Sequence, residues 1–232
     1  IKNPPNRYLA DPFIWKKDNR TICYVEDYSY KTGKGHIAAI ELKKDGYNFL
    51  GSVIKKDYHL SYPFIFEYEN NIYMCPESSE NKSIDLYVCK HFPSKWVFER
   101  KIINNISAVD TNIFKFDSKW WLFTNVDSAN IGEHCSELHI FYSKDPLTSD
   151  WEPHKKNPVI FDSRIARNGG LIIEKDEIYR VYQKQDIGLY GASMGVAKIE
   201  VINEYDKLIN SETEVEIATD EIDAEIATTL EE

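Results

Sequence analysis

Short runs of alternating apolar and polar residues recur along this chain in four similar segments. The segments begin ADPFIW, SYPFIF, VDTNIF and RNGGLI, at residues 10, 61, 109 and 167. In each one, an apolar strand leads through a polar turn into a second strand that is rich in aromatic residues. A third strand follows, and its four copies read GHIAAIEL, SIDLYVCKH, ELHIFYSKD and MGVAKIEV. The pattern predicts a repeated unit of at least three antiparallel strands.

Several strands in each unit, repeated roughly every 50 residues, predict a β-propeller. A β-sandwich with irregular hairpins is the alternative, but it does not require a hairpin to recur in register four times. We therefore expect an all-β protein with a five-bladed propeller over residues 1–210, in which four blades are visible in the sequence. The fifth blade would be assembled from residues 205–232 with the N-terminal stretch, or be partly lost. Residues 211–232 are expected to be an acidic tail that is helical, blade-closing or disordered.

Charge separates this tail from the rest of the chain. The formal net charge is −10, yet nine acidic residues and no basic ones lie between Ser211 and Glu232. The remaining chain is nearly neutral, so it lacks the basic excess typical of nucleic-acid binding. No apolar run reaches the roughly 18 residues of a membrane-spanning helix.

Cysteine usage points to a reducing compartment. None of the four cysteines forms a CxxC pair, and we expect them to be small buried apolar residues rather than a disulfide framework. The four are Cys23, Cys75, Cys89 and Cys135. This interpretation favours a cytoplasmic location.

Polar residues occupy two equivalent positions of the repeat. The first strand of each segment starts with Asp11, Tyr62, Asp110 and Asn168. The second strand ends with Asp27 or the neighbouring Glu26, and then with Glu77, Asn125 and Gln183. Equivalent positions of successive blades point towards the same part of a propeller axis, so we expect these side chains to converge at one mouth. Carboxylates that share a pocket shift one another's pKa values, which suits acid–base chemistry at a sugar.

Several further residues are candidates for substrate binding. Arg167 adjoins the polar positions and could bind a phosphorylated sugar, because arginine makes bidentate contacts to phosphate. The paired glycines that follow Asn168 are interpreted as clearance for backbone or ligand. Other candidates have simpler explanations as surface or core residues: Arg7, Arg164, His36, His59, the run 154–156, Trp120 and Trp121. The two tryptophans in particular are expected to pack in the core.

Motifs for metals and nucleotides are absent from the sequence. It contains no HExxH, EF-hand loop or paired CxxC, and no glycine-rich phosphate loop. We therefore expect no cofactor, and nothing in the sequence supports an ion on the propeller axis.

The stretches HLSYPFIF, NIYMCPES, KWWLF, ARNGG and YRVYQ resemble the N-terminal propeller domain of glucosamine inositolphosphorylceramide transferases and their bacterial relatives. The resemblance covers roughly residues 8–203 and extends to the five-bladed arabinanases, invertases and levansucrases. It implies a carbohydrate site at the axial mouth, where Asp11 matches a carboxylate that acts as base or nucleophile. Tyr62 stands where the resemblance implies an Asp in blade two. Blade three has Asp110 at its entry, but no residue there matches the acid Glu that the resemblance implies. The set of residues for hydrolysis is therefore incomplete.

These features predict a glycosyltransferase that moves a glycosyl unit, furanosyl or phosphoribosyl among the candidates, to a saccharide acceptor in surface-glycan synthesis. Asp11 would be the base or nucleophile-like carboxylate, with Glu77 and Asp110 as second carboxylate and positioning group. Arg167 and Asn168 would hold hydroxyls or phosphate. Two alternatives stay open, an arabinanase-like glycoside hydrolase and a non-catalytic glycan-binding propeller. The expected partners are a saccharide or sugar-phosphate substrate and other domains of a longer parent chain.

Overall fold

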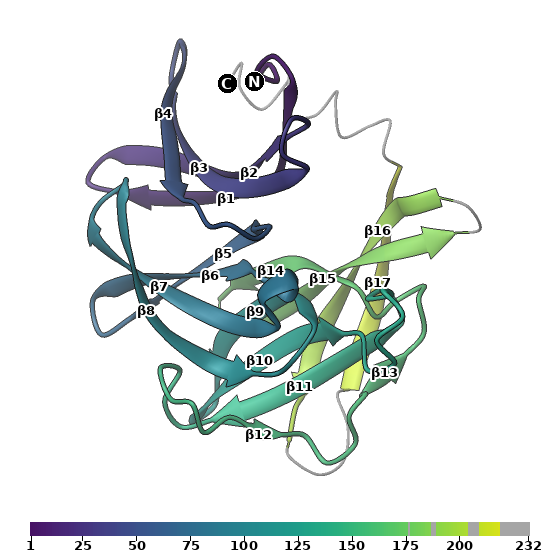
Figure 1. The fold of residues 1–232 in the computed structure, drawn as a ribbon. Helices are drawn as coiled ribbons and strands as arrows, with labels where there is room; N and C mark the ends of the chain where they lie inside the picture. The colour runs from purple at the N-terminus through teal and green to yellow at the C-terminus, as the bar shows by residue number, and fades with distance from the viewer. Residues whose placement is uncertain (176, 187–188, 204–208, 219–232) are drawn as a thin grey trace. The chain divides into compact units, whose positions relative to one another are not determined.

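The computed structural model describes residues 1–175, 177–186, 189–203 and 209–218 (Figure 1). These residues form four β-sheets and one short 3-10 helix, η1 (Ser79–Asn81). Each sheet corresponds to one of the four repeated segments, so the repeat in the sequence is a repeat of sheets. The expectation of an all-β protein is confirmed.

The first two sheets are antiparallel meanders in which each strand pairs with the next one along the chain. The first contains β1 (Arg7–Lys17), β2 (Arg20–Ser29), β3 (Lys34–Lys43) and β4 (Gly46–Ile54). The second contains β5 (Ser61–Tyr68), β6 (Asn71–Glu77), β7 (Ser83–His91) and β8 (Lys95–Asn104). Two-residue turns at Asp18–Asn19 and Glu69–Asn70 have positive φ at both positions, as a type I′ hairpin turn requires.

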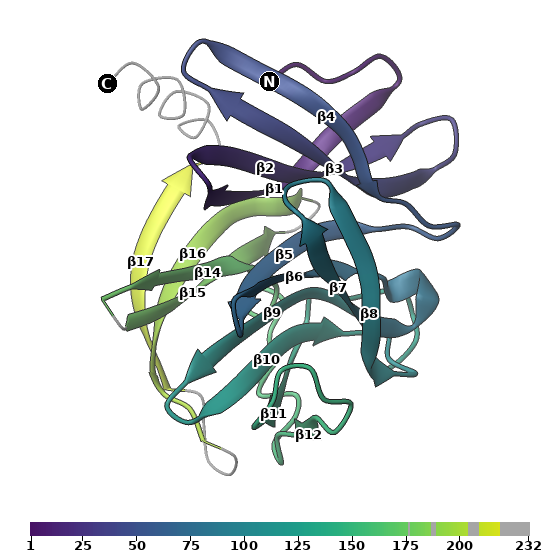
Figure 2. The ribbon, with the colours of Figure 1, turned by 90° about the vertical axis from the view of Figure 1, so that its left-hand side faces the viewer.

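The third and fourth sheets follow the same plan with more irregular connections. The third has the order β12-β11-β10-β9, and β13 also pairs with β11. Its strands are β9 (Ala108–Phe116), β10 (Lys119–Val126), β11 (Glu137–Ser143), β12 (Glu152–Pro153) and β13 (Ile160–Phe161). The fourth, whose strands are labelled in Figure 2, contains β14 (Asn168–Glu174), β15 (Glu177–Asp186), β16 (Leu189–Val201) and β17 (Ile209–Ala218).

The chain divides into two compact units, and the division falls within β10. The first unit comprises Ile1–Leu122 with Ser143–Glu152, and the second comprises Phe123–Tyr142 with Pro153–Glu232. In the first unit, alternate residues of β2 and β3 share a core with the second sheet: Ile22, Tyr24, Ile37, Ala39, Leu60, Ile65, Met74 and Tyr87. The residues between them form a separate apolar cluster on the other face of the first sheet, with Cys23, Val25, Ala38 and Ile40, as the two-residue period of a strand requires.

A β-bulge interrupts the pairing near the start of β1 and of β5. The register shifts between Ala10 and Phe13 and between Ser61 and Phe64. Asp11 and Tyr62 lie in these bulges with left-handed φ values of 49° and 43°, and Asp110 in β9 has a φ of 51°. Non-glycine residues rarely adopt this conformation, and such strain is concentrated at functional sites. The repeated polar positions are therefore also repeated backbone irregularities.

In the fourth sheet, glycine supplies the unusual backbone angle. The register shifts between Asn168 and Gly170, and Gly170 has a φ of 141°. A Cβ at this position would meet no described atom within 4 Å, whereas one at Gly169 would lie 3.3 Å from Cγ1 of Val181. Gly170 is therefore not needed as clearance for neighbouring backbone, and its role in the sheet is conformational. Clearance for a ligand at these glycines stays a prediction.

Part of the segment expected as a tail is a strand. β17 crosses residue 210 and pairs with β16. The weak helix anticipated at 221–230 lies outside the described residues. The part of the chain that the structure describes contains no fifth sheet.

The two glycines give a direct test of this local geometry. Gly170→Ala should lower the free energy of unfolding by roughly 1–2 kcal/mol, because alanine is strained at a φ of 141°. Gly169→Ala is the matched control and should cost less, because only a small shift of Val181 is needed. Chemical denaturation of both variants checks this, and an equal or larger loss for Gly169→Ala would contradict it.

Candidate functional site

Asp11 is fixed at the edge of the first sheet by a contact with the second. Its Oδ2 accepts a hydrogen bond from the backbone N–H of Tyr62 at 3.1 Å. The Tyr62 hydroxyl in turn donates to Oδ1 of Asn112 at 3.0 Å, and its ring packs edge-on against Phe13. Tyr62 is only 3% exposed, so it links the sheets from within and offers no open stacking surface.

The strand register identifies the carboxylate that is equivalent to Glu77. Ala10 pairs with Glu26, and Ser61 pairs with Glu77. Glu26, rather than Asp27, therefore occupies the repeated position at the end of the second strand. The spacing in the sequence agrees, since the interval from 11 to 26 equals those from 62 to 77, 110 to 125 and 168 to 183.

The Glu26 carboxyl lies in a space that exists because residue 35 is glycine. Glu26 is 5% exposed, and a Cβ on Gly35 would lie 2.5 Å from its Oε1 and 2.6 Å from the carbonyl oxygen of Leu60. Oε1 is buried and has no hydrogen-bond partner among the described residues. A buried carboxylate oxygen without a partner is costly, which favours the protonated acid.

Burial above all, together with the nearby charges of Asp11 and Asp27, raises the pKa of Glu26 to about 7. The two carboxyls of Asp11 and Glu26 are thus within electrostatic range of each other. A carboxylic acid that keeps its proton near neutral pH can act as a general acid.

His59 completes this group from the segment between β4 and β5. Its Nδ1 accepts a hydrogen bond from the N–H of Gly35 at 3.0 Å, so the proton of the neutral ring is on Nε2. Nε2 lies 3.5 Å from Oε1 of Glu26. Burial lowers the pKa of His59, against the opposing charges of Glu80 and Asp11. His59 is therefore a neutral side chain whose N–H faces the Glu26 carboxyl.

Asp27, His36 and Arg7 form a separate group on the other face of the first sheet. Asp27 is fully buried, and its Oδ2 lies 2.8 Å from Nη1 of Arg7 and 3.5 Å from Nε2 of His36. Burial lowers the pKa of His36, while Asp27 raises it. The alternation of side chains along β2 separates this group from Glu26.

The other two carboxylates predicted for the first unit lie outside the first sheet, in β6 and β9. Glu77 is half-buried and accepts a hydrogen bond from the Ser79 hydroxyl at 3.3 Å. Asp110 is 2% exposed within β9. Asp11 and Glu26 are therefore the pair that the first sheet brings together.

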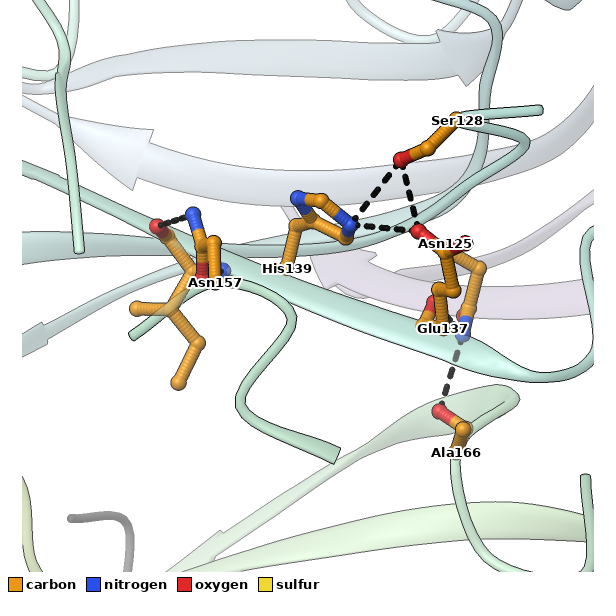
Figure 3. Close-up of polar contacts among 7 residues, drawn as sticks. Asn125, Ser128, Glu137, His139, Asn157 and Ala166 are labelled. Carbon is orange, nitrogen blue, oxygen red and sulfur yellow. Dashed lines mark hydrogen bonds and ion pairs between the residues drawn. The ribbon is translucent and has the colours of Figure 1, made fainter. Parts of the chain in front are cut away.

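In the second unit, the predicted amide residues do converge. Nδ2 of Asn125 donates to the carbonyl oxygens of Glu137 and Ala166, both at 2.9 Å (Figure 3). Oδ1 of Asn125 accepts a hydrogen bond from the N–H of Asn168 at 2.8 Å. Nε2 of Gln183 donates to the carbonyl oxygen of Asn168 at 2.9 Å. These amides hold the backbone before β14, which is a scaffolding role.

Two features of the second unit are not evident from the sequence. Arg180 is 1% exposed, and its Nη2 donates to the carbonyl oxygen of Ile165 at 2.6 Å, so this charged residue shapes the turn before Asn168. Oε2 of Glu137 accepts from the Ser128 hydroxyl at 2.6 Å and lies 2.8 Å from Nε2 of His139 (Figure 3). Neither a buried arginine nor a cluster formed between a turn and a strand leaves a periodic signal in the sequence.

The remaining basic candidates differ in accessibility. Arg167 is half-buried, and its Nη1 donates to Sγ of Cys135 at 3.4 Å. Arg164 is exposed and pairs with Asp162 at 2.6 Å. His154, from the run 154–156, is buried, and its Nδ1 accepts the N–H of Lys156 at 3.1 Å.

The two tryptophans are buried as the sequence predicts, and so are two of the four cysteines. Trp120 and Trp121 are 7% and 3% exposed, and Trp120 packs against Phe66 and Tyr68. All four cysteines are free thiols; Cys23 and Cys75 are buried, whereas Cys89 and Cys135 are partly so. Within the described ranges, no group of three or more His, Cys, Asp or Glu side chains could hold a metal ion. No helix in the same ranges is long and apolar enough to cross a membrane.

The repeated sheets define the class of protein as an all-β propeller, of which four blades are described. A family 117 glycoside hydrolase from the marine bacterium Zobellia galactanivorans has the same fold, with a TM-score of 0.68 at 12% identity over 92% of this chain and 71% of its own. Residues 2–226 match the family described as "Glucosamine inositolphosphorylceramide transferase 1, N-terminal", and the chain belongs to this family.

Two plant proteins illustrate the relationship. Glucosamine inositolphosphorylceramide transferase 1 of Oryza sativa subsp. japonica is 35% identical over 201 residues, which cover 84% of this chain and 27% of that protein. The protein of the same name from Arabidopsis thaliana is 36% identical over 205 residues, which cover 86% of this chain and 26% of its own. The chain therefore spans about a quarter of the length of these relatives, and the resemblance predicted from the motifs is confirmed.

Glu26 should make stability fall as the pH rises. Its folded-state pKa of about 7 lies above the ordinary value of 4.5, so the folded protein keeps a proton that the unfolded chain releases. Stability is therefore lost between these two pH values. Glu26→Gln should unfold less readily than the native protein at pH 8, by roughly 1–3 kcal/mol, and the difference should vanish near pH 4.

Thermal and urea unfolding across this pH range measure the effect. Glu67→Gln is the control, because Glu67 is an exposed carboxylate of the second sheet and should change neither the size nor the pH dependence of stability. A Glu26→Gln protein that is no more stable than the native one at pH 8 would rule out a raised pKa.

Proposed function

We propose that this propeller is a carbohydrate-active enzyme that transfers a glycosyl unit to a saccharide acceptor in surface-glycan synthesis. One observation carries the proposal: the bulge places Asp11 within electrostatic range of Glu26, whose carboxyl is desolvated. Chemistry at a glycosidic carbon commonly uses two carboxyl groups in different protonation states. The family relationship supports the same class of chemistry, because the plant relatives are named as transferases.

The two carboxyls take complementary roles in this proposal. Asp11, in its ionised form, removes the proton from the acceptor hydroxyl as that oxygen forms its bond to the glycosyl carbon. Glu26, in its protonated form, donates its proton to the oxygen of the departing group as the old bond breaks. One proton is taken up and one is released, and exchange with solvent restores both residues. His59 keeps the Glu26 carboxyl oriented through its Nε2–H.

The donor and the setting are part of the same proposal. A furanosyl or phosphoribosyl unit is the proposed donor group. Glu77 and Asp110 are proposed to position the acceptor or donor. Other domains of a longer protein are the proposed partners, which the greater length of the plant relatives supports.

Hydrolysis is the second candidate, and the likeness of fold to a glycoside hydrolase favours it. In that case water takes the place of the saccharide acceptor, and the same two carboxyls act on it. Release of free sugar from an oligosaccharide, with no activated donor present, would distinguish hydrolysis from transfer.

We further propose that a fifth sheet completes the propeller. The apolar cluster of Cys23, Val25, Ala38 and Ile40 faces away from the second sheet, and a cavity of about 170 Å³ adjoins it. A further sheet packed on this face would cover the cluster, as neighbouring blades do in propellers.

Single-carboxyl variants test the proposed chemistry. Asp11→Asn and Glu26→Gln should each reduce kcat by about 10²–10⁴-fold, the range of general acid or base catalysis. The assay supplies a panel of nucleotide-activated and phosphate-activated sugars with oligosaccharide acceptors, and it records both transfer product and free sugar. In the native protein, the rate should fall above a pH near 7, where Glu26 loses its proton.

Glu67→Gln is the matched control and should keep full activity, since its carboxylate is exposed. An Asp11→Asn protein with undiminished turnover would contradict the role of Asp11. If saccharide binds but no donor in the panel yields transfer or hydrolysis, the propeller is a binding module and the proposal fails.

A further inference from the structure

Three tyrosines gather at the same end of the first sheet, and the proposed chemistry does not use them. Tyr8 and Tyr28 are partners across β1 and β2, and their rings stack with centroids 4.9 Å apart. The ring of Tyr30 lies 5.7 Å from that of Tyr8 and 5.8 Å from that of Tyr28. Tyr30 is 65% exposed, so this tyrosine cluster presents aromatic surface to solvent.

The tyrosine cluster adjoins the carboxyl pair. Tyr28 follows Glu26 by two positions on β2 and so shares its face of the sheet. The rings of Tyr28 and His59 have centroids 6.0 Å apart. Burial raises the pKa of Tyr8, and the charges of Glu26 and Asp11 add to this effect. A ligand that reaches the carboxyls from this side therefore passes the aromatic rings.

A cavity of about 520 Å³ opens beside Tyr30, and its size is within the range of small-ligand sites, roughly 300–1,000 Å³. It is lined by Pro5, Asn6, Arg7, Ser29, Tyr30 and Lys31. Backbone hydrogen bonds fix its walls: the N–H of Tyr30 donates to the carbonyl oxygen of Asn6 at 3.1 Å, and the N–H of Arg7 donates to that of Pro4 at 3.2 Å. The backbone segments that line the cavity are thus held in place by hydrogen bonds.

The charge of the cavity lining is positive. Two of its six residues, Arg7 and Lys31, are cations, and none is acidic. Nη1 of Arg7 pairs with Asp27, but a guanidinium has five N–H donors in a planar fork and can bind a second anion. Lys31 is exposed. Such a lining attracts a negatively charged group rather than a neutral one.

We propose that this cavity binds an anionic group carried by the saccharide substrate, and that a sugar ring of the same molecule packs against Tyr30. The anionic group is a phosphate or a uronate carboxylate, since arginine and lysine recognise the oxygens of both. The inference rests on the proposed function, because it assumes a saccharide at this end of the sheet. It adds a place where charge on the substrate is recognised.

The test is a binding measurement on the whole chain, by calorimetry or ligand-observed NMR. The probes are glucose, glucose 1-phosphate, glucuronate and inorganic phosphate. We expect glucose 1-phosphate or glucuronate to bind at least about tenfold more tightly than glucose, and glucose 1-phosphate more tightly than phosphate alone. Whichever charged sugar binds more tightly identifies the source of the anion.

Two variants with matched controls locate the site. Tyr30→Ala should weaken binding of the preferred charged sugar by about fivefold or more, because it removes a ring contact. Tyr47→Ala is its control, since Tyr47 is also exposed, at 43%, but pairs with Leu42 at the opposite end of the first sheet. Lys31→Ala should remove most of the preference for charged over neutral sugar, and Lys44→Ala, also exposed, should leave it intact.

Equal binding of glucose and both charged sugars would overturn the inference, as would equal effects of Tyr30→Ala and Tyr47→Ala. Failure of the proposed function gives a different result. Asp11→Asn should bind the charged sugar normally in this assay even though its turnover is lost. Retained turnover in Asp11→Asn, with binding still dependent on Tyr30 and Lys31, would reject the catalytic roles and keep the binding site.

Discussion

The hydrogen bond from the backbone N–H of Tyr62 to the carboxylate of Asp11, at 3.1 Å, ties the first sheet to the second and determines where the candidate chemistry lies. Both residues have left-handed backbone angles within β-bulges. Such angles persist only where the surrounding structure holds them. The carboxylate is therefore positioned by the packing of sheets rather than by a mobile loop, and the site derives its rigidity from the fold.

Glu26 shows the cost of this arrangement. Its carboxyl occupies space left by Gly35 and is removed from water, which disfavours its ionised form and weakens the folded state at neutral pH. A group that reduces stability yet is suited to proton transfer is typical of functional sites. The side-chain amides of Asn125 and Gln183 show the opposite case, because their hydrogen bonds are made to the backbone, including that of Asn168, and hold β14 in place.

Local signals in the sequence were sufficient to predict the four sheets and the grouping of the amide residues. The formation of a hairpin such as that at Asp18–Asn19 depends only on residues close in sequence. The constant spacing of the repeat then identifies which residues occupy equivalent positions in successive sheets. The equal interval between the two polar positions of each repeat already favours Glu26 over Asp27. The desolvation of Glu26 could not be predicted in the same way, because it depends on bulges and on packing between strands. The tyrosine cluster could not be predicted because it depends on cross-strand pairing. Arginine is normally exposed, so the burial of Arg180 could not be predicted from its residue type either.

The central claim is that Glu26 keeps its proton near neutral pH beside the carboxyl of Asp11. Carboxyl ¹³C NMR measures this directly: the side-chain signal of Glu26, assigned by its loss in Glu26→Gln, is followed from pH 3 to pH 9. The structure predicts a midpoint at a pKa of about 7, and a lower midpoint in Asp11→Asn, where one neighbouring charge is removed. A midpoint near the ordinary value of 4.5, unchanged in Asp11→Asn, would contradict the assignment of Glu26 as the proton donor.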